Sequence, residues 1–70
     1  MRHETLIAAR KKSGKTQAQV AKEIGFTDVA YQRYEYGKRE PKVTAAIRIA
    51  KALGSTVENI WGATAQNLKV

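Results

Sequence analysis

Residues 16–37 read TQAQVAKEIGFTDVAYQRYEYG and contain two short helix patterns separated by three residues. In the first pattern Thr16 is placed to cap a helix, and Gln19, three residues later, is placed to complete a capping box. Thr27 is the candidate N-cap of the second pattern, which predicts a helix from about residue 28 to residue 36. Because so short a joint does not allow an antiparallel hairpin, we expect the two helices to cross steeply.

A steep crossing restricts the residues at the joint. One position must be small where the second helix passes over the first, one must allow the turn, and larger side chains must fill the space beneath. The residues that we expect to meet these structural requirements of a helix-turn-helix are Ala21, Gly25, Tyr31 and Tyr34.

Helix signals continue on both sides of this unit, and strand signals are scarce. Residues 2–12 are helix-permissive and end at a Ser-Gly pair, residues 42–53 have apolar side chains at helical spacing after Pro41, and residues 55–61 form a short capped pattern. The sequence therefore predicts a compact all-α fold of five helices. We expect residues 1–62 to form one domain, with residues 63–70 a tail that is disordered or part of a dimer interface.

Charge and composition bound the function. Lys and Arg number 13 against 6 Asp and Glu, so the net charge is +7 and the partner is expected to be polyanionic, either nucleic acid or an anionic membrane surface. The absence of cysteine excludes disulfides and thiolate metal sites. No apolar run approaches the roughly 20 residues of a membrane span, so a soluble, cytoplasmic protein is expected.

No pattern for catalysis is present. We find no nucleophile beside a base, no phosphate-binding glycine loop and no metal-ligand spacing, and 70 residues leave little room for a deep active site. His3, the single histidine, is expected at a frayed terminus and without a catalytic or metal role. The sequence predicts no enzyme, no cofactor and no metal.

The strings TQAQVAKEIG, YEYGKREP and RIAKALGSTVENIWG follow one another over about residues 5–61. In this order, with the pattern E-x-G-K-x-x-P in the second string, the chain resembles the Cro/CI-type (XRE), lambda-repressor-like transcriptional regulators of prokaryotes and phages. The resemblance implies that family's five-helix fold. It also implies that the second helix of the helix-turn-helix, residues 28–36, reads the major groove of double-stranded DNA as part of a repressor-like regulator.

The resemblance assigns base contacts to one face of that helix, at Asp28, Val29, Gln32 and Arg33. Arg33 suits guanine or a phosphate, Gln32 suits adenine, and Val29 suits a thymine methyl group. A carboxylate is repelled by phosphate, so Asp28 either accepts from a cytosine amino group or only caps and shapes the helix. For the other three residues the plain alternative is a solvated helix face.

Phosphate contacts are implied at four further positions: Gln17, Thr27, Lys38 and Arg39. We expect the backbone amides that follow Gly37 to bind phosphate together with the two cationic side chains. The family also suggests a structural ion pair between Arg10 and Glu35.

Three residues depart from the family pattern. Ala9 stands where a larger apolar side chain is common. Lys15 stands where an apolar residue is usual, and Tyr31 replaces a branched aliphatic residue. If Tyr31 is buried, its hydroxyl needs a hydrogen-bond partner; otherwise the ring leans toward the DNA groove.

One short recognition helix contacts only a few base pairs, so a homodimer is expected. We expect its interface at the last helix and the tail, where apolar side chains are Ile47, Val57, Trp61, Leu68 and Val70. Ile60 and Trp61 are alternatively core residues. The hypothesis from another class is a protein-interaction module on the same fold, for example an antitoxin, so a protein partner remains possible.

Overall fold

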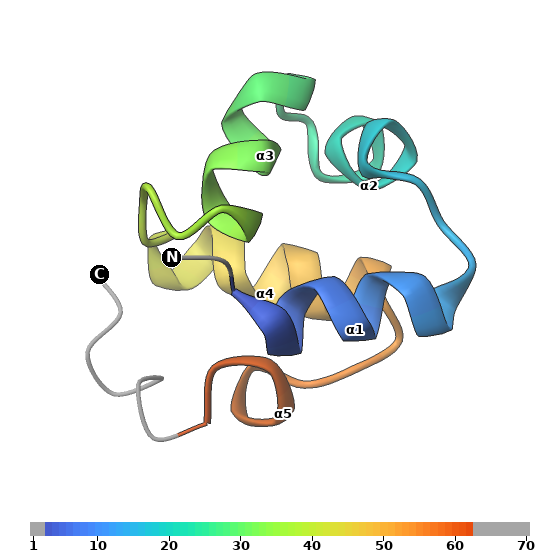
Figure 1. Cartoon of the computed structure of the whole chain (residues 1–70), viewed down its shortest axis with the longest axis vertical. Coiled ribbons are helices and arrows are strands. Elements are labelled where there is room, and N and C mark those ends of the chain that lie inside the picture. Colours follow the sequence, from blue (N-terminus) through green and yellow to red (C-terminus); the bar gives the residue numbers. More distant parts are fainter. Residues whose placement is uncertain (1–2, 63–70) are drawn as a thin grey trace.

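The computed structural model describes residues 3–62, and this part of the chain folds into five α-helices (Figure 1). Their bounds are α1 Glu4–Ser13, α2 Gln17–Ile24, α3 Asp28–Glu35, α4 Val43–Ala52 and α5 Val57–Trp61. The predicted all-α fold and its five helices are therefore confirmed, with shifts of one or two residues at helix ends.

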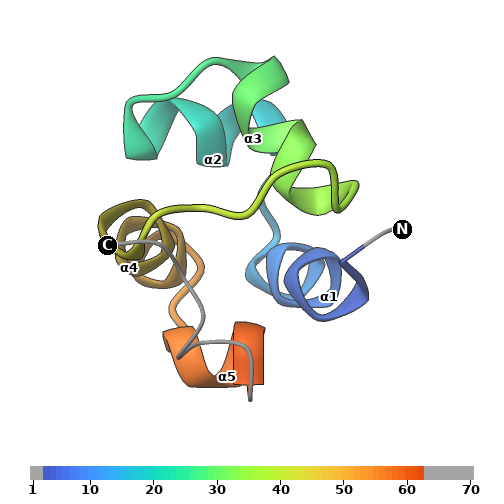
Figure 2. The ribbon, with the colours of Figure 1, turned by 90° about the vertical axis from the view of Figure 1, so that its left-hand side faces the viewer.

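The helices surround one central core. Figure 2 shows α1 and α4 on opposite sides of the molecule, α2 and α3 above them and α5 below. Contacts join α2 to α3 and α4, and join α5 to α1 and α4. Because α2 and α3 form a layer of their own, the outer side of α3 stays clear of the other helices.

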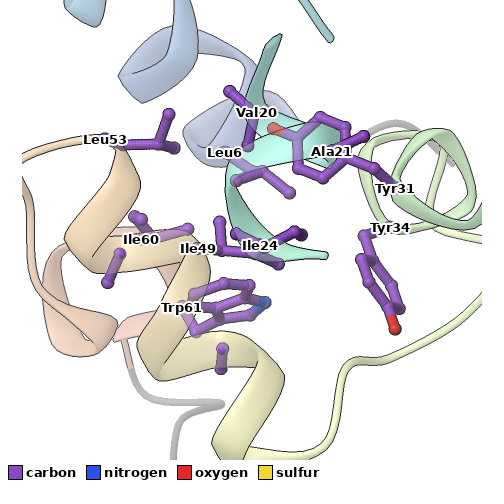
Figure 3. Packing of buried hydrophobic residues seen from close by; sticks show 12 residues of the cluster. Leu6, Val20, Ala21, Ile24, Tyr31, Tyr34, Ile49, Leu53, Ile60 and Trp61 are labelled. Atoms are coloured by element: carbon purple, nitrogen blue, oxygen red, sulfur yellow. The ribbon is translucent and has the colours of Figure 1, made fainter. Parts of the chain in front are cut away.

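The core draws apolar side chains from every helix (Figure 3). Leu6, Val20, Tyr31 and Ile49 are fully excluded from solvent. Burying a side chain of this size contributes about 1.5–3 kcal/mol relative to leaving it exposed. The remaining buried members of the cluster are Ala21, Ile24, Tyr34, Ala46, Ala50, Leu53, Ile60 and Trp61.

Threonine caps begin three of the helices. Thr16 forms the predicted capping box: its hydroxyl accepts from the Gln19 amide at 3.1 Å, and its own amide donates to the Gln19 side chain at 2.8 Å. Thr27 accepts from the Ala30 amide at 3.2 Å, and Thr56 accepts from the Asn59 amide at 3.0 Å. Each bond satisfies an amide that lacks a partner within its helix.

The joint between α2 and α3 turns sharply at Gly25. Its φ of 77° lies in the left-handed region, which glycine adopts without the steric cost of a Cβ. The Phe26 amide donates to the Ala21 carbonyl at 2.8 Å, and the Ala21 side chain is fully buried. The structural positions predicted at the joint therefore lie where the crossing needs them.

The N-terminal end of α1 differs from the prediction. The helix begins at Glu4, and His3 is its N-cap, with Nδ1 accepting from the Leu6 amide at 3.2 Å. The His3 amide donates to the Glu35 carbonyl at 2.7 Å, and its ring meets Trp61 edge-on at 5.8 Å between centroids. These contacts hold His3 in place, so the expectation that it is frayed is wrong. The sequence did not show this, because histidine is an uncommon cap and the tertiary partners of His3 lie far away in the chain.

Candidate nucleic-acid interface

One side of α3 is packed and the other is open. Tyr31 and Tyr34 face the core, whereas Val29 is 57% exposed and Asp28 and Arg33 are also exposed. Gln32 is half-buried beside them. Because residues three and four apart share a helix face, the structure brings together on one surface all the residues expected to contact bases.

Asp28 lies in the first turn of α3, where its carboxylate is favoured by the positive end of the helix dipole. The capping bond itself is made by Thr27, and within residues 3–62 the Asp28 carboxylate accepts no hydrogen bond. Asp28 is therefore an exposed acceptor and not the cap of this helix. The Thr27 hydroxyl accepts from Ala30, which leaves its own hydrogen available to a phosphate.

The segment after α3 carries two exposed cations, Lys38 and Arg39. Their backbone amides both donate to the Arg33 carbonyl, at 2.9 and 3.3 Å. Both amides therefore satisfy the C-terminal end of α3 in the protein alone, and phosphate binding by the amides after Gly37 stays a prediction. The two side chains form no ion pair within the described part of the chain, so they present free charge close to Arg33.

Gln17 opens α2, as expected of a residue that approaches phosphate, but its side chain is turned inward. Its Nε2 donates to Glu35 Oε1 at 2.9 Å, and the residue is half-buried. One of its two amide hydrogens is therefore committed to another protein group, and only the second remains for a phosphate.

A buried polar cluster holds the base of α3, where Glu35 is only 1% exposed. Arg10 Nε donates to Glu35 Oε2 at 2.6 Å, and Arg10 Nη1 donates to the Lys15 carbonyl at 3.0 Å. With the bond from Gln17, this cluster ties α1 and α2 to the C-terminal end of α3. The ion pair suggested by the family resemblance is present.

The surroundings of Glu35 decide its charge. Burial alone would raise the pKa of its carboxyl group, but Arg10, then the neighbouring Tyr31 hydroxyl, then Gln17 outweigh burial and hold the pKa below its ordinary value of 4.5. The hydrogen bond between Arg10 and Glu35 also raises the pKa of Arg10. The pair is therefore ionised at neutral pH.

Tyr31 is buried beside this cluster and does not lean toward a DNA groove. Its hydroxyl makes no hydrogen bond of acceptable geometry among the described residues, although it lies next to Glu35. Burial, followed by the proximity of Glu35, raises the pKa of the phenol. The departure from an aliphatic residue thus places an unsatisfied polar atom in the core.

Lys15, which stands where the family usually has an apolar residue, has a clear structural role. Lys15 Nζ donates to the Ala52 carbonyl at 2.6 Å and to Glu23 Oε1 at 2.9 Å. The Ala52 carbonyl belongs to the last turn of α4, where carbonyls lack helical partners and a cation is favoured by the helix dipole. Lys15 therefore joins the α1–α2 connection to the end of α4 by charge instead of by apolar packing.

The surface expected to form a dimer is only partly apolar in this structure. Trp61 is 4% exposed and Ile60 is 2% exposed, so both are core residues. Val57 packs partly against the same core, whereas Ile47 on α4 is 42% exposed. Leu68 and Val70, which were expected to contribute, lie outside the described residues.

Residues 3–62 show neither a membrane-spanning helix nor a metal-binding group. No helix there is long and apolar enough to cross a membrane. No group of three or more His, Asp or Glu side chains is arranged to hold a metal ion in the same residues.

A helix-turn-helix family model matches residues 6–60, and the chain belongs to this family of Cro/CI (XRE) type. The chain is 39% identical over 59 residues to the cryptic phage CTXphi transcriptional repressor RstR of Vibrio cholerae serotype O1. That match covers 84% of this chain and 53% of RstR, so the chain spans about half the length of this relative. No solved structure matches the chain significantly.

Proposed function

We propose that this helix-turn-helix protein is a sequence-specific, double-stranded DNA-binding regulator of transcription. The observation that supports this most directly is the open face of α3, whose exposed polar side chains adjoin unpaired cations after its C-terminal end. The similarity to a phage repressor favours repression over activation. In this proposal residues 1–62 are the DNA-binding domain, and residues 63–70 are a tail that lies outside this domain and is available to a dimer interface.

In the proposed complex α3 enters the major groove and α2 crosses the DNA backbone. Arg33 reads guanine, Gln32 reads adenine and Val29 meets a thymine methyl group, while Asp28 accepts from a cytosine amino group. Phosphate contacts come from the side chains of Lys38 and Arg39, from the Thr27 hydroxyl and from the side-chain amide of Gln17. These positioning contacts add affinity without reading sequence.

A single short recognition helix specifies too few base pairs for a useful operator. We therefore propose a homodimer whose two α3 helices meet half-sites about 34 Å apart, one turn of DNA. Ile47 is a large apolar side chain exposed on α4 and supports a surface there. Because Trp61 is buried within the protomer, any contribution from α5 comes from its outer side and from the tail that follows it.

Selection of bound sequences from a random duplex pool tests this proposal. We expect the purified protein to enrich a two-fold symmetric motif, and a salt titration on that motif to show a negative slope of log K against log salt. Arg33→Ala should relax the motif at one symmetric pair of positions while retaining the fold, and Lys12→Ala, which removes an exposed cation from α1, is the matched control.

Two results would contradict the proposal. Enrichment of no sequence, with binding to random duplex that disappears at moderate salt, would leave only generic attraction to a basic protein. In that case the next step would be a search for a protein partner. Enrichment of an asymmetric motif by a monomer would instead remove the dimer and keep the DNA-reading function.

A further inference from the structure

A cavity of about 680 Å³ lies between α3 and the first two turns of α4. Figure 2 shows the segment that joins these helices running from one to the other, and residues of this segment line the cavity. The volume falls in the range of roughly 300–1,000 Å³ that is usual for small-molecule sites. Phe26, Tyr34 and Ala45 of its lining belong to the edge of the core, and none of the four expected base-contacting residues of α3 lines it.

Apolar and aromatic groups line one part of the cavity. Phe26 and Tyr34 contribute rings whose centroids are 6.1 Å apart and tilted by 53°, and Ala30 and Ala45 complete this part. Figure 3 shows the Tyr34 ring at the edge of the core with its hydroxyl pointing away from the other labelled side chains. Phe26 is half-buried and leaves part of its ring open to the cavity, whereas Tyr34 is only 7% exposed, so the aromatic contact for a ligand comes mainly from Phe26.

Cations line the rest of the cavity. Its lining includes Lys38, Arg39, Lys42 and Arg48, and Glu40 is the single carboxylate among them. All four cations are exposed, and none forms an ion pair within residues 3–62. Apart from Glu40, their mutual repulsion is relieved by solvent or by a bound anion. Lys42 and Arg48 gave no functional signal in the sequence, because only the packing of α4 against α2, together with the course of the α3–α4 segment, brings them to this place.

We propose that this cavity binds a small aromatic anion, with its ring against Phe26 and Tyr34 and its phosphate or carboxylate among the four cations. The pairing of an apolar wall with unpaired cations matches an amphipathic ligand better than a bare inorganic ion. A guanidinium such as that of Arg48 can donate hydrogen bonds to either anionic group.

The ligand controls DNA binding by competition, and this part of the inference rests on the proposed function. Lys38 and Arg39 line the cavity and are also the proposed phosphate contacts. A bound anion neutralises these side chains, so they release fewer counterions when DNA binds. Ligand binding and DNA binding then oppose each other.

The test uses naphthyl phosphate as the probe, with inorganic phosphate and neutral naphthol as the two halves of its chemistry. Amide chemical shifts of the whole chain are followed by NMR without DNA. We expect naphthyl phosphate to shift the amides of Ala30, Thr44 and Ala45 saturably. We expect it to bind at least about tenfold more tightly than either control, because only it satisfies both parts of the site.

Arg48→Ala should weaken naphthyl phosphate by about fivefold to tenfold, since it removes a charge-assisted hydrogen bond from the cavity. Arg48 has no place in the proposed DNA contacts, so operator binding by this variant should be retained. Lys12→Ala removes one exposed cation from α1, outside the cavity, and should leave the ligand affinity unchanged. Both variants keep every residue of the core.

Operator binding is then measured at constant ionic strength with and without the probe. A concentration ten times its Kd should raise the apparent Kd for DNA about tenfold, as simple competition requires. Equal binding of inorganic phosphate and naphthyl phosphate would overturn the aromatic ligand. Unchanged operator affinity in saturating probe would overturn the competition. If no operator is found, the proposed function fails, whereas the titration without DNA still decides the cavity.

Discussion

The inner and outer sides of α3 carry charge in opposite ways. At its C-terminal end Glu35 is almost completely buried and its carboxylate accepts from Arg10 and Gln17. On its outer side Asp28 and Arg33 are exposed and unpaired within the described residues. Eight residues thus contain one charge that is fixed by the fold and others that are left for a partner.

The difference follows from solvation. Removing a charge from water is costly unless an opposite charge and hydrogen bonds replace the lost water, so a buried charge must be fully paired. An exposed charge keeps its water and gains little from a neighbour. The buried charge therefore sets the position of α3, and the charges on the exposed side stay available to a partner.

The largest effect is expected at the buried end. Glu35→Ala should cost about 3–5 kcal/mol in the free energy of unfolding, because it leaves Arg10, whose side chain is only 14% exposed, without its counter-charge. Chemical denaturation followed by circular dichroism measures this loss. Glu40→Ala, at an exposed carboxylate, should stay within about 0.5 kcal/mol. If the two variants lost similar stability, the buried cluster would not hold α3.

On the exposed side, Arg33→Ala should cost about 1–3 kcal/mol in operator binding and relax the base preference at one symmetric pair of positions. Its free energy of unfolding should be almost unchanged, because Arg33 packs against no other helix. Competition binding with single-base operator variants measures the preference. An equal loss on every sequence would assign Arg33 to phosphate instead.

The pH dependence of stability sharpens the comparison. Since the pKa of Glu35 is lowered in the folded state, its contribution is complete above the unfolded value near 4.5 and is lost as pH falls through the lower folded pKa. Glu35→Gln should therefore be less stable than the natural chain at neutral pH, and this difference should shrink in acid. Denaturation at several pH values tests this, and a difference independent of pH would contradict it.

A Lys38→Ala substitution should have a smaller, sequence-independent effect. It should weaken operator and random DNA to a similar extent and reduce the slope of log K against log salt by about 1. Fluorescence anisotropy at several salt concentrations measures both quantities. An unchanged slope would remove Lys38 from the DNA interface.

The smallest effect is expected at Tyr31. Tyr31→Phe removes a buried hydroxyl that has no hydrogen-bond partner, so the free energy of unfolding should be unchanged or increased by up to about 1 kcal/mol. Thermal and chemical denaturation measure the change. A clear loss of stability would show that the hydroxyl supports Glu35 after all.

Local sequence signals predicted much of the fold. The capping box of Thr16 and Gln19, the cap at Thr27 and the turn at Gly25 each depend on residues within a few positions of one another. Such interactions are visible in a sequence because their geometry is set by the local backbone. The expected base-contacting residues share one face of α3 for the same reason.

Interactions between distant residues were not visible in the same way. The contact of His3 with Trp61, the bond of Lys15 to α4 and the inward turn of Gln17 join segments that are far apart in the chain. The burial of Trp61 likewise depends on how α5 packs against α1 and α4. These features follow from packing, which no local pattern specifies.

The sequence by itself determined that the chain is helical, where its turns lie and which face of α3 is polar, because these depend on side-chain spacing and backbone preference. Only the tertiary structure decided which charges are available. It buried Glu35 with Arg10, committed the amides after Gly37 to α3, and gathered Lys42 and Arg48 with the cations of the α3–α4 segment around one cavity. Solvation and pairing are properties of position in space, and the chain acquires them only when its helices pack.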